Sequence, residues 1–272
     1  MKIVYLGNFK WSFCTESHIS KTLELMGHEV IRLQEDMTGV DHVIEEANNA
    51  DLFLWTRTPG LLQGDGWQMI RKIKVPKISY HLDLYMGLSR EKDVPDDPFF
   101  FTDYIFQADG DPESMDKFKA LGINAYWMPP AVYGPEMTLG TPRDEFRHDT
   151  AFIGNYNYGH EEWREYRQKV LDMVKENFDY EIYPNAEHPI VMDQKLNDVL
   201  ASTKIMIGDS VCLGLTHKNY WSNRLVEEIG RGGFVIFPRI PGIETQFELD
   251  KELITYELGD MDDLKHKIRY FL

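Results

Sequence analysis

The residues from His217 to Pro238 are the best suited in the chain to bind a charged ligand. They read as a polar loop, a short helix over 222–231, a double-glycine stop and a buried strand. The unpaired N–H groups and the positive dipole end at the start of a helix bind anions such as a diphosphate. Asn219 or Ser222 can cap this helix. The alternative is an ordinary αβ unit in which Arg224 and Glu227 of this helix form a pair on a solvent-exposed face.

Two charged side chains of this helix indicate which parts of a nucleotide it would contact. Arg224 lies in the first turn, where a guanidinium can donate paired hydrogen bonds to phosphate oxygens. Glu227 follows three residues later on nearly the same face, where its carboxylate can accept hydrogen bonds from ribose hydroxyls. Gly232 and Gly233 end the helix, because glycine adopts the required backbone conformation at little cost.

Strands and helices alternate along the chain in two successive groups. Strands of the first group are expected at 2–6, 29–33, 51–55, 75–81, 104–108 and 125–128. Those of the second are expected at 150–153, 180–183, 205–208 and 234–237, before a final helix over 257–271. This alternation predicts parallel sheets covered by helices on both faces. The fold class is therefore α/β, with two Rossmann-like domains that face a central cleft at the carboxyl ends of their strands.

A stretch rich in proline and glycine separates the two groups. Pro129 and Pro130 interrupt the alternation, and no periodicity follows until about Arg147. We therefore expect an N-terminal domain over 1–130, a linker over 131–147 and a C-terminal domain over 148–272.

Loops that leave the carboxyl ends of strands in the C-terminal domain are expected to converge on one ligand. They are rich in Gly, Asn and Tyr, which let the backbone approach a ligand and offer neutral hydrogen bonds. With the helix residues, they give the candidate binding site: Gly154, Asn155, Tyr183, Asp209, Ser210, His217, Asn219, Ser222, Asn223, Arg224 and Glu227. The alternative for each loop is a plain αβ turn.

The N-terminal domain offers polar residues at corresponding places. The loop after its first strand carries Asn8, and Glu16 and His18 follow at the start of the next helix. His81 and Asp83 end a later strand, where either side chain can act as a general base toward a hydroxyl group. A histidine packed in the core, or an aspartate that caps a helix, is the alternative for these two residues.

Composition and charge argue against several classes of protein and site. The net charge of −16 is shared by both halves, which disfavours a basic nucleic-acid-binding surface. Cys14 and Cys212 lie far apart and the nine histidines are scattered, so neither a disulfide framework nor a zinc site is expected. Asp109 and Asp111 have the Asp-x-Asp form of some metal sites, but Pro112 directly after them favours a helix cap.

No apolar run approaches the ~20 residues of a membrane span, and the first residues do not form a signal peptide. We expect a soluble, cytoplasmic protein without a metal site. Its oligomeric state is left open.

Several segments resemble those of the GT-B glycosyltransferases. The segment Glu227–Ile236 is similar to their donor-site helix and strand, whose pattern is Glu-Ala-x-Ala-x-Gly-x-Pro-Val-Ile, with Glu227 and Gly232 at matching positions. Arg224 completes the Arg-x-x-Glu form of the CgeB-like branch among the glycosyl transferases of group 1. Further similar segments are Thr150–Asn155, Trp127–Pro130 and the tail Tyr256–Leu272.

The resemblance implies a metal-independent glycosyltransferase that needs no cofactor. A nucleotide-diphosphate sugar would be the co-substrate, with Glu227 on the ribose and Arg224 on the diphosphate. The N-terminal domain would bind the acceptor, whose hydroxyl attacks the sugar. Retaining members often carry a further glutamate eight positions before the one that corresponds to Glu227. In this chain Asn219 occupies that position, so whether the reaction retains or inverts the anomeric configuration is left open.

The acceptor is equally open: a glycan, a protein, a small molecule or a modified base in DNA. Two other functions share the architecture. A sugar-nucleotide epimerase would act on the nucleotide sugar without an acceptor, and a non-catalytic two-domain protein would only bind a small ligand.

Overall fold

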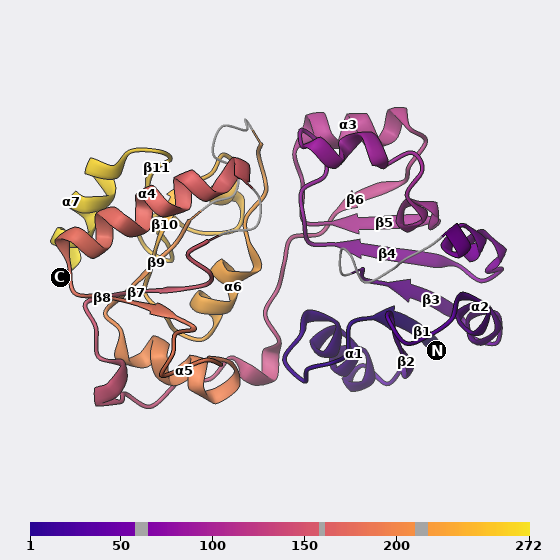
Figure 1. The fold of residues 1–272 in the computed structure, drawn as a ribbon, viewed down its shortest axis with the longest axis horizontal. Helices are drawn as coiled ribbons and strands as arrows, with labels where there is room; N and C mark the ends of the chain where they lie inside the picture. Colours follow the sequence, from indigo (N-terminus) through magenta and orange to yellow (C-terminus); the bar gives the residue numbers. More distant parts are fainter. Residues whose placement is uncertain (58–64, 158–160, 210–216) are drawn as a thin grey trace. The chain divides into compact units, whose positions relative to one another are not determined.

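A computed structural model describes residues 1–57, 65–157, 161–209 and 217–272. The chain divides into two compact units, Met1–Pro129 and Pro130–Leu272, each built on one parallel sheet (Figure 1). The predicted class of two Rossmann-like α/β domains is thereby confirmed. Within these described ranges, no helix is long and apolar enough to cross a lipid bilayer.

The first unit contains a six-stranded sheet in the order β2-β1-β3-β4-β5-β6. Its strands are β1 (Lys2–Gly7), β2 (Glu29–Gln34), β3 (Leu52–Trp55), β4 (Lys77–His81), β5 (Tyr104–Gln107) and β6 (Ala125–Trp127), and its α-helices are α1 (Thr15–Leu25), α2 (Val40–Asn48) and α3 (Pro112–Ala120). From β1 the chain moves first to β2 and then back past β1 to β3. The carboxyl ends of β1 and β3 therefore border a topological switch point, where sheets of this kind bind ligands.

Two 3₁₀-helices of the first unit lie between the expected strands. They are Asp65–Lys72, before β4, and Pro98–Phe101, between β4 and β5. Asp97 caps the second one, with its side chain accepting a hydrogen bond from the N–H of Phe99. Its residues Phe99 and Phe100 are buried and contribute to the core near the end of β4.

The second unit has a five-stranded sheet in the order β11-β10-β9-β7-β8. Its strands are β7 (Thr150–Ile153), β8 (Tyr180–Tyr183), β9 (Ile205–Ile207), β10 (Val235–Arg239) and β11 (Ile254–Glu257), and its α-helices are α4 (Glu161–Asn177), α5 (Asp193–Ser202), α6 (Asn223–Gly230) and α7 (Met261–Phe271). Here the strand order reverses at β7, so the carboxyl ends of β7 and β9 border the second switch point.

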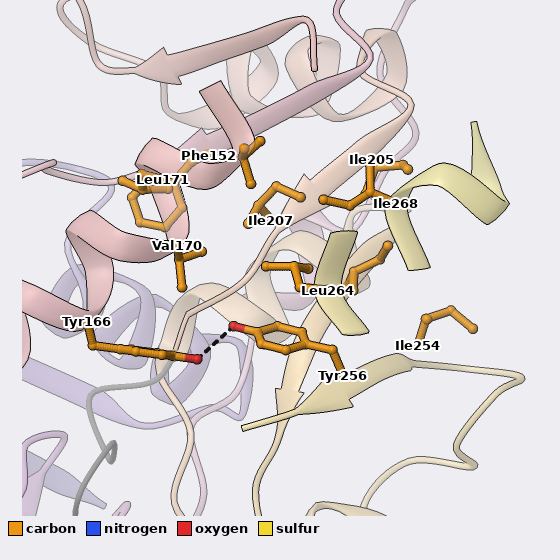
Figure 2. Close-up of a cluster of buried hydrophobic side chains, with 12 residues drawn as sticks. Phe152, Tyr166, Val170, Leu171, Ile205, Ile207, Ile254, Tyr256, Leu264 and Ile268 are labelled. Atoms are coloured by element: carbon orange, nitrogen blue, oxygen red, sulfur yellow. Dashed lines mark hydrogen bonds between the residues drawn. The ribbon is translucent and has the colours of Figure 1, made fainter. Parts of the chain in front are cut away.

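Right-handed crossovers decide which helices share a face of the second sheet. The chain passes from β7 outward to β8 through α4, and returns past β7 to β9 through α5, so these two helices cover opposite faces. The final helix α7 packs on the α4 face, where Leu264 and Ile268 join Val170 in one buried cluster (Figure 2). Leu264 and Ile268 are four residues apart in the sequence, a spacing that places both side chains on one side of α7.

Residues 131–147, expected to form a linker, belong to the second unit. Their backbone lies against α5: the N–H of Thr141 donates to a carboxylate oxygen of Asp198 at 2.8 Å. A Cβ atom on Gly140 would lie 2.0 Å from the carbonyl oxygen of Asn197, so only glycine fits there. This segment is therefore packed structure, fixed by a close approach and by hydrogen bonds to a helix.

We expect Leu264→Ala to destabilise the chain by about 2–5 kcal/mol, because it removes a fully buried side chain that joins α7 to the sheet. Urea denaturation of the variant and the wild type measures this. Lys265→Ala, at a neighbouring position of the same helix outside the buried cluster, is the control and should change the free energy of unfolding by less than about 0.5 kcal/mol. Equal effects of the two substitutions would contradict the packing described.

Candidate functional site

The short helix α6 starts close to the second switch point. It begins at Asn223 after an extended N-cap residue, Ser222, whose side chain makes no capping hydrogen bond. The Ser222 hydroxyl is buried and has no hydrogen-bond partner among the described residues. Asn219, the other candidate cap, has a left-handed backbone (φ 55°) and donates its N–H to the carbonyl oxygen of Pro241 at 2.9 Å. The first N–H groups of α6 are thus not capped by Ser222, although it occupies the N-cap.

Three charged side chains meet at the carboxyl ends of β7 and β9, and we call Arg167, Asp209 and Arg224 the switch-point cluster. One oxygen of Asp209 pairs with Nη1 of Arg224 at 2.9 Å, and the other pairs with Nε of Arg167 at 2.6 Å. Asp209 and Arg167 are almost fully buried, whereas 18% of the Arg224 side chain is exposed. Two guanidinium groups share one carboxylate, so the three residues together carry an excess positive charge.

The end of β7 and the loop after it contact the two guanidinium groups of this cluster. The Asn155 carbonyl oxygen accepts a hydrogen bond from Nη1 of Arg167 at 3.1 Å. The Phe152 ring lies beneath both guanidinium groups, with its centroid 4.4 Å from Cζ of Arg224. Gly154 has a φ of 147°, and a Cβ atom there would lie 3.0 Å from the Phe152 ring. Glycine therefore lets this loop run close beside the two guanidinium groups.

Glu227, one turn along α6, is held by neighbouring side chains. Its carboxylate pairs with Nε of Arg231 at 3.0 Å, and the amide of Asn223 donates to its other oxygen at 3.4 Å. Arg231 is buried and also pairs with the carboxylate of Glu136 and with the amide oxygen of Asn197. The Glu227 carboxylate is thus fixed in place from one side, while 17% of its side chain remains exposed.

Glu228, which the sequence analysis did not select, is a buried acid next to this cluster. It is 1% exposed, and neither carboxyl oxygen has a hydrogen-bond partner among the described residues. The pKa of Glu228 is raised to about 8, mainly by burial. The nearby charge of Asp209 adds to the increase, and that of Arg224 partly offsets it. Glu228 is therefore largely protonated at neutral pH. Its position three residues after the buried Leu225 was the available signal, because such spacing places both on the inner face of the helix.

The other predicted residues of this unit lie in different surroundings. Tyr183 is buried at the end of β8, where its ring packs against Phe146 and His188 and burial raises its pKa to about 12. His217 is buried, six residues before the start of α6. Ser210 lies outside the described residues. The structure thus brings Gly154, Asn155, Asp209 and Arg224 together, while Tyr183 packs in a separate aromatic group.

In the first unit, His81 lies inside an aromatic group and not on the surface. Its ring centroid is 3.9 Å from that of Phe99 and 4.6 Å from that of Phe100, and the residue is 2% exposed. Burial lowers the pKa of His81 well below its usual value, so the ring is neutral at physiological pH. Asp83, two residues further along, is only half-buried. Of the two predicted catalytic residues, Asp83 is the more accessible.

The predicted acceptor-side residues follow β1. The amide oxygen of Asn8 accepts hydrogen bonds from the N–H of Lys10 at 3.3 Å and from the Gln34 amide at 3.4 Å. Glu16 and His18 lie in the first turns of α1 and are both buried. Among the three, only Asn8 is at the loop surface.

Comparison with known proteins gives a family match for the second unit and structural likenesses for the whole chain. Residues 141–272 match a family model described as glycosyl transferase-like. No curated protein sequence matches the chain at a significant level. Among solved structures, Anabaena Alr3699/HepE in complex with UDP-glucose has a TM-score of 0.63 at 11% identity, over 99% of this chain and 89% of that one.

A glycosyltransferase from Rickettsia africae ESF-5 has a TM-score of 0.59 at 9% identity, over 99% of this chain and 87% of that one. These structural likenesses confirm the predicted GT-B fold. The family match of the second unit confirms the prediction of a glycosyltransferase.

We expect Asp209→Asn to destabilise the chain by about 3–5 kcal/mol, because it removes a buried carboxylate that pairs with both Arg167 and Arg224. Chemical denaturation measures the loss. Asp149→Asn breaks an ion pair with the exposed Lys204 in the same unit and should cost less than about 1 kcal/mol. A loss at Asp209 as small as that at Asp149 would contradict the structural role of the cluster.

Glu228→Gln should make the chain more stable at neutral pH. The pKa of Glu228 is about 8 in the folded chain against an ordinary 4.5, so between these values the unfolded chain ionises first and folding is opposed. The free energy of unfolding of the wild type should therefore fall by a few kcal/mol relative to that of the variant as the pH rises from about 4.5 to 8. Below that range the difference between the two proteins should not change with pH.

Denaturation curves of both proteins across this pH range give the difference directly. Glu176→Gln, at an exposed position of α4, is the matched control and should give a constant difference. A pH-independent difference for Glu228→Gln would show that the carboxyl group is not perturbed.

Proposed function

We propose that the chain transfers a sugar from a nucleoside-diphosphate donor to a hydroxyl group of an acceptor. The observation that carries the proposal is the switch-point cluster, which offers a partly exposed guanidinium with excess positive charge beside the start of α6, where the Ser222 side chain makes no capping hydrogen bond. Both features suit a diphosphate, because phosphate oxygens accept hydrogen bonds from guanidinium and N–H groups. The Anabaena protein was crystallised with UDP-glucose, so a UDP-sugar is the first donor to examine.

In this proposal, Arg224 and the first N–H groups of α6 bind the diphosphate, and Glu227 accepts hydrogen bonds from the ribose hydroxyls. Arg167 is buried and keeps the Asp209 carboxylate oriented toward Arg224. Glu228 contributes by staying protonated, since its ionisation would add a negative charge near Arg224 and weaken the attraction for the diphosphate.

The reaction we propose is a substitution at the anomeric carbon. The acceptor hydroxyl oxygen forms a bond to that carbon, the bond to the diphosphate oxygen breaks, and the hydroxyl proton passes to a general base. Asp83 is our candidate base, because it is half-buried whereas His81 is enclosed by aromatic rings. Charge that develops on the leaving diphosphate is stabilised by Arg224, and such prepositioned donors commonly contribute roughly 100-fold or more to the rate.

We further propose that the reaction needs no metal ion and that the chain belongs to the CgeB-like branch. The Arg-x-x-Glu spacing of Arg224 and Glu227 supports the branch. The positive charge of Arg224 supports a metal-independent departure of the diphosphate, since a guanidinium can supply the charge that a cation supplies elsewhere. Within the residues described, no group of three His, Cys, Asp or Glu side chains is arranged to hold a metal.

We expect Arg224→Ala to reduce sugar transfer roughly 100-fold or more and to weaken UDP binding. Nucleotide release from a panel of sugar nucleotides measures turnover, and the UDP-dependent shift in melting temperature measures binding. Arg147→Ala, an exposed arginine of the same unit, is the control and should behave as the wild type. Wild-type turnover by Arg224→Ala would overturn the assignment.

Product analysis separates the alternatives. A sugar nucleotide incubated without an acceptor should give slow hydrolysis to nucleoside diphosphate and free sugar. Conversion to an epimeric sugar nucleotide would identify an epimerase. Tight binding without any chemical change would identify a non-catalytic binding protein.

A further inference from the structure

Two aromatic rings of the first unit lie on the loop that follows β1. Trp11 is 57% exposed, and its ring stacks on that of Phe13 with centroids 5.7 Å apart and planes inclined by 11°. We call these two residues the aromatic platform. The loop leaves the carboxyl end of β1, one of the two strands that border the first switch point. Adjacent exposed apolar side chains that are surrounded by polar residues are typical of a ligand-binding surface, whereas a single exposed ring is not.

Hydrogen bonds hold the loop, so the exposure of Trp11 does not come from a loose backbone. The Trp11 carbonyl oxygen accepts hydrogen bonds from the Ser17 hydroxyl at 2.8 Å and from the N–H of Cys14 at 3.3 Å. Nearer β1, the N–H of Phe9 donates to the side-chain oxygen of Gln34 at 2.7 Å. Hydrogen bonds to Ser17 of α1 and to Gln34 of β2 therefore fix the loop that carries the platform.

Polar groups surround the start of the same loop. The Gln34 amide nitrogen donates to Asp36 at 2.7 Å and lies 3.4 Å from the Asn8 amide oxygen, and Lys10 pairs with Asp36. The Lys10 and Asp36 side chains are 44% and 26% exposed. Amide, carboxylate and ammonium groups thus lie on the loop that carries the two rings and on the strand end beside it. This combination offers both donors and acceptors to hydroxyl groups.

We propose that the aromatic platform binds a pyranose ring of the acceptor, so that the acceptor is a glycan or a glycan-bearing molecule. This inference rests on the proposed transfer reaction and names the class of its second substrate. One face of a pyranose ring presents C–H groups that pack on an indole, and its hydroxyls need hydrogen-bond partners at the edge. An apolar surface with a few fixed polar groups is what such a ligand requires.

The surroundings disfavour the other acceptors. A nucleic acid would bring phosphates toward a chain with a net charge of −16 and toward the Asp36 carboxylate, which would repel them. Two side chains also offer far less area than the roughly 1,200 Å² that a specific protein–protein interface buries. A single sugar ring matches both the size of the platform and the neutral and charged groups around it.

An array of immobilised oligosaccharides, probed with the full chain in the presence of UDP, tests the proposal. We expect the wild type to bind a subset of the glycans, and Trp11→Ala to bind the same glycans at least roughly tenfold more weakly. Trp11→Phe should retain most of the binding, because it keeps an aromatic face. Tyr126→Ala removes another exposed aromatic ring of the first unit, which contacts Tyr104 on β5, and should bind as the wild type.

Transfer kinetics with a glycan found on the array give a second readout. Trp11→Ala should raise the KM for the glycan at least roughly tenfold and leave the KM for the sugar nucleotide unchanged. The same variant should keep the UDP-dependent shift in melting temperature, which reports on the second unit alone. If the wild type releases no nucleoside diphosphate from any sugar nucleotide of the panel, the proposed function fails, whatever the array shows.

An array without signal, from a protein that does bind UDP, would overturn the glycan proposal. So would equal glycan binding by the wild type and Trp11→Ala. Binding to DNA fragments or peptides in place of glycans, lost in Trp11→Ala, would assign the platform to a different acceptor and also overturn it.

Discussion

The carboxylate of Asp209 is the interaction on which the candidate site depends. Each of its oxygens is used, one by Arg167 of α4 and the other by Arg224 of α6, and the whole group is buried. Buried charges are tolerated only when they are paired and hydrogen-bonded, so these elements must keep a fixed relation to one another. The Asn155 carbonyl oxygen ties the loop after β7 to the same arrangement. Two loops and two helices thus share one electrostatic constraint.

The hydrophobic core directly beneath reinforces that constraint. Tyr166, the neighbour of Arg167 on α4, turns into the core and its hydroxyl lies 3.0 Å from that of Tyr256 (Figure 2). The Tyr256 hydroxyl in turn donates to the Gly208 carbonyl oxygen, one residue before Asp209. Adjacent residues of one helix therefore serve the core and the polar cluster. The hydrogen bonds of the two tyrosines and the ion pairs of Asp209 therefore fix the position of the same segment, the carboxyl end of β9.

The fold could be predicted largely from the sequence, whereas the site could be predicted only in part. Periodicity and glycine stops located the strands and helices, because both signals are local. Asp209 and Arg224 were selected as polar residues at strand and helix ends, and they do pair. Arg167 was missed because its partner is 42 residues away and nothing in its own helix distinguishes it from a surface arginine.

Two other differences have equally specific causes. His81 was selected as a possible general base at a strand end, but Phe99 and Phe100 enclose it from a 3₁₀-helix that has no periodic signal. Glu228 was passed over because an acid next to Glu227 looks like a solvent-exposed residue. Only the apolar spacing from Leu225 marked its inward position. Local patterns fix elements, but burial of a charged group depends on contacts made across the fold.

The packing of residues 131–147 decides where the second unit begins as a separable module. The family match begins at residue 141, inside this segment, but Glu136 lies before it and pairs with the buried Arg231. A fragment cut at residue 148 would leave that guanidinium with Glu227 as its remaining carboxylate partner among the described residues. It would also remove Phe146 from the core. A fragment that keeps the carboxylate partners of Arg231 and its own core must therefore extend beyond the sheet and helices of the second unit. It must begin near Pro130.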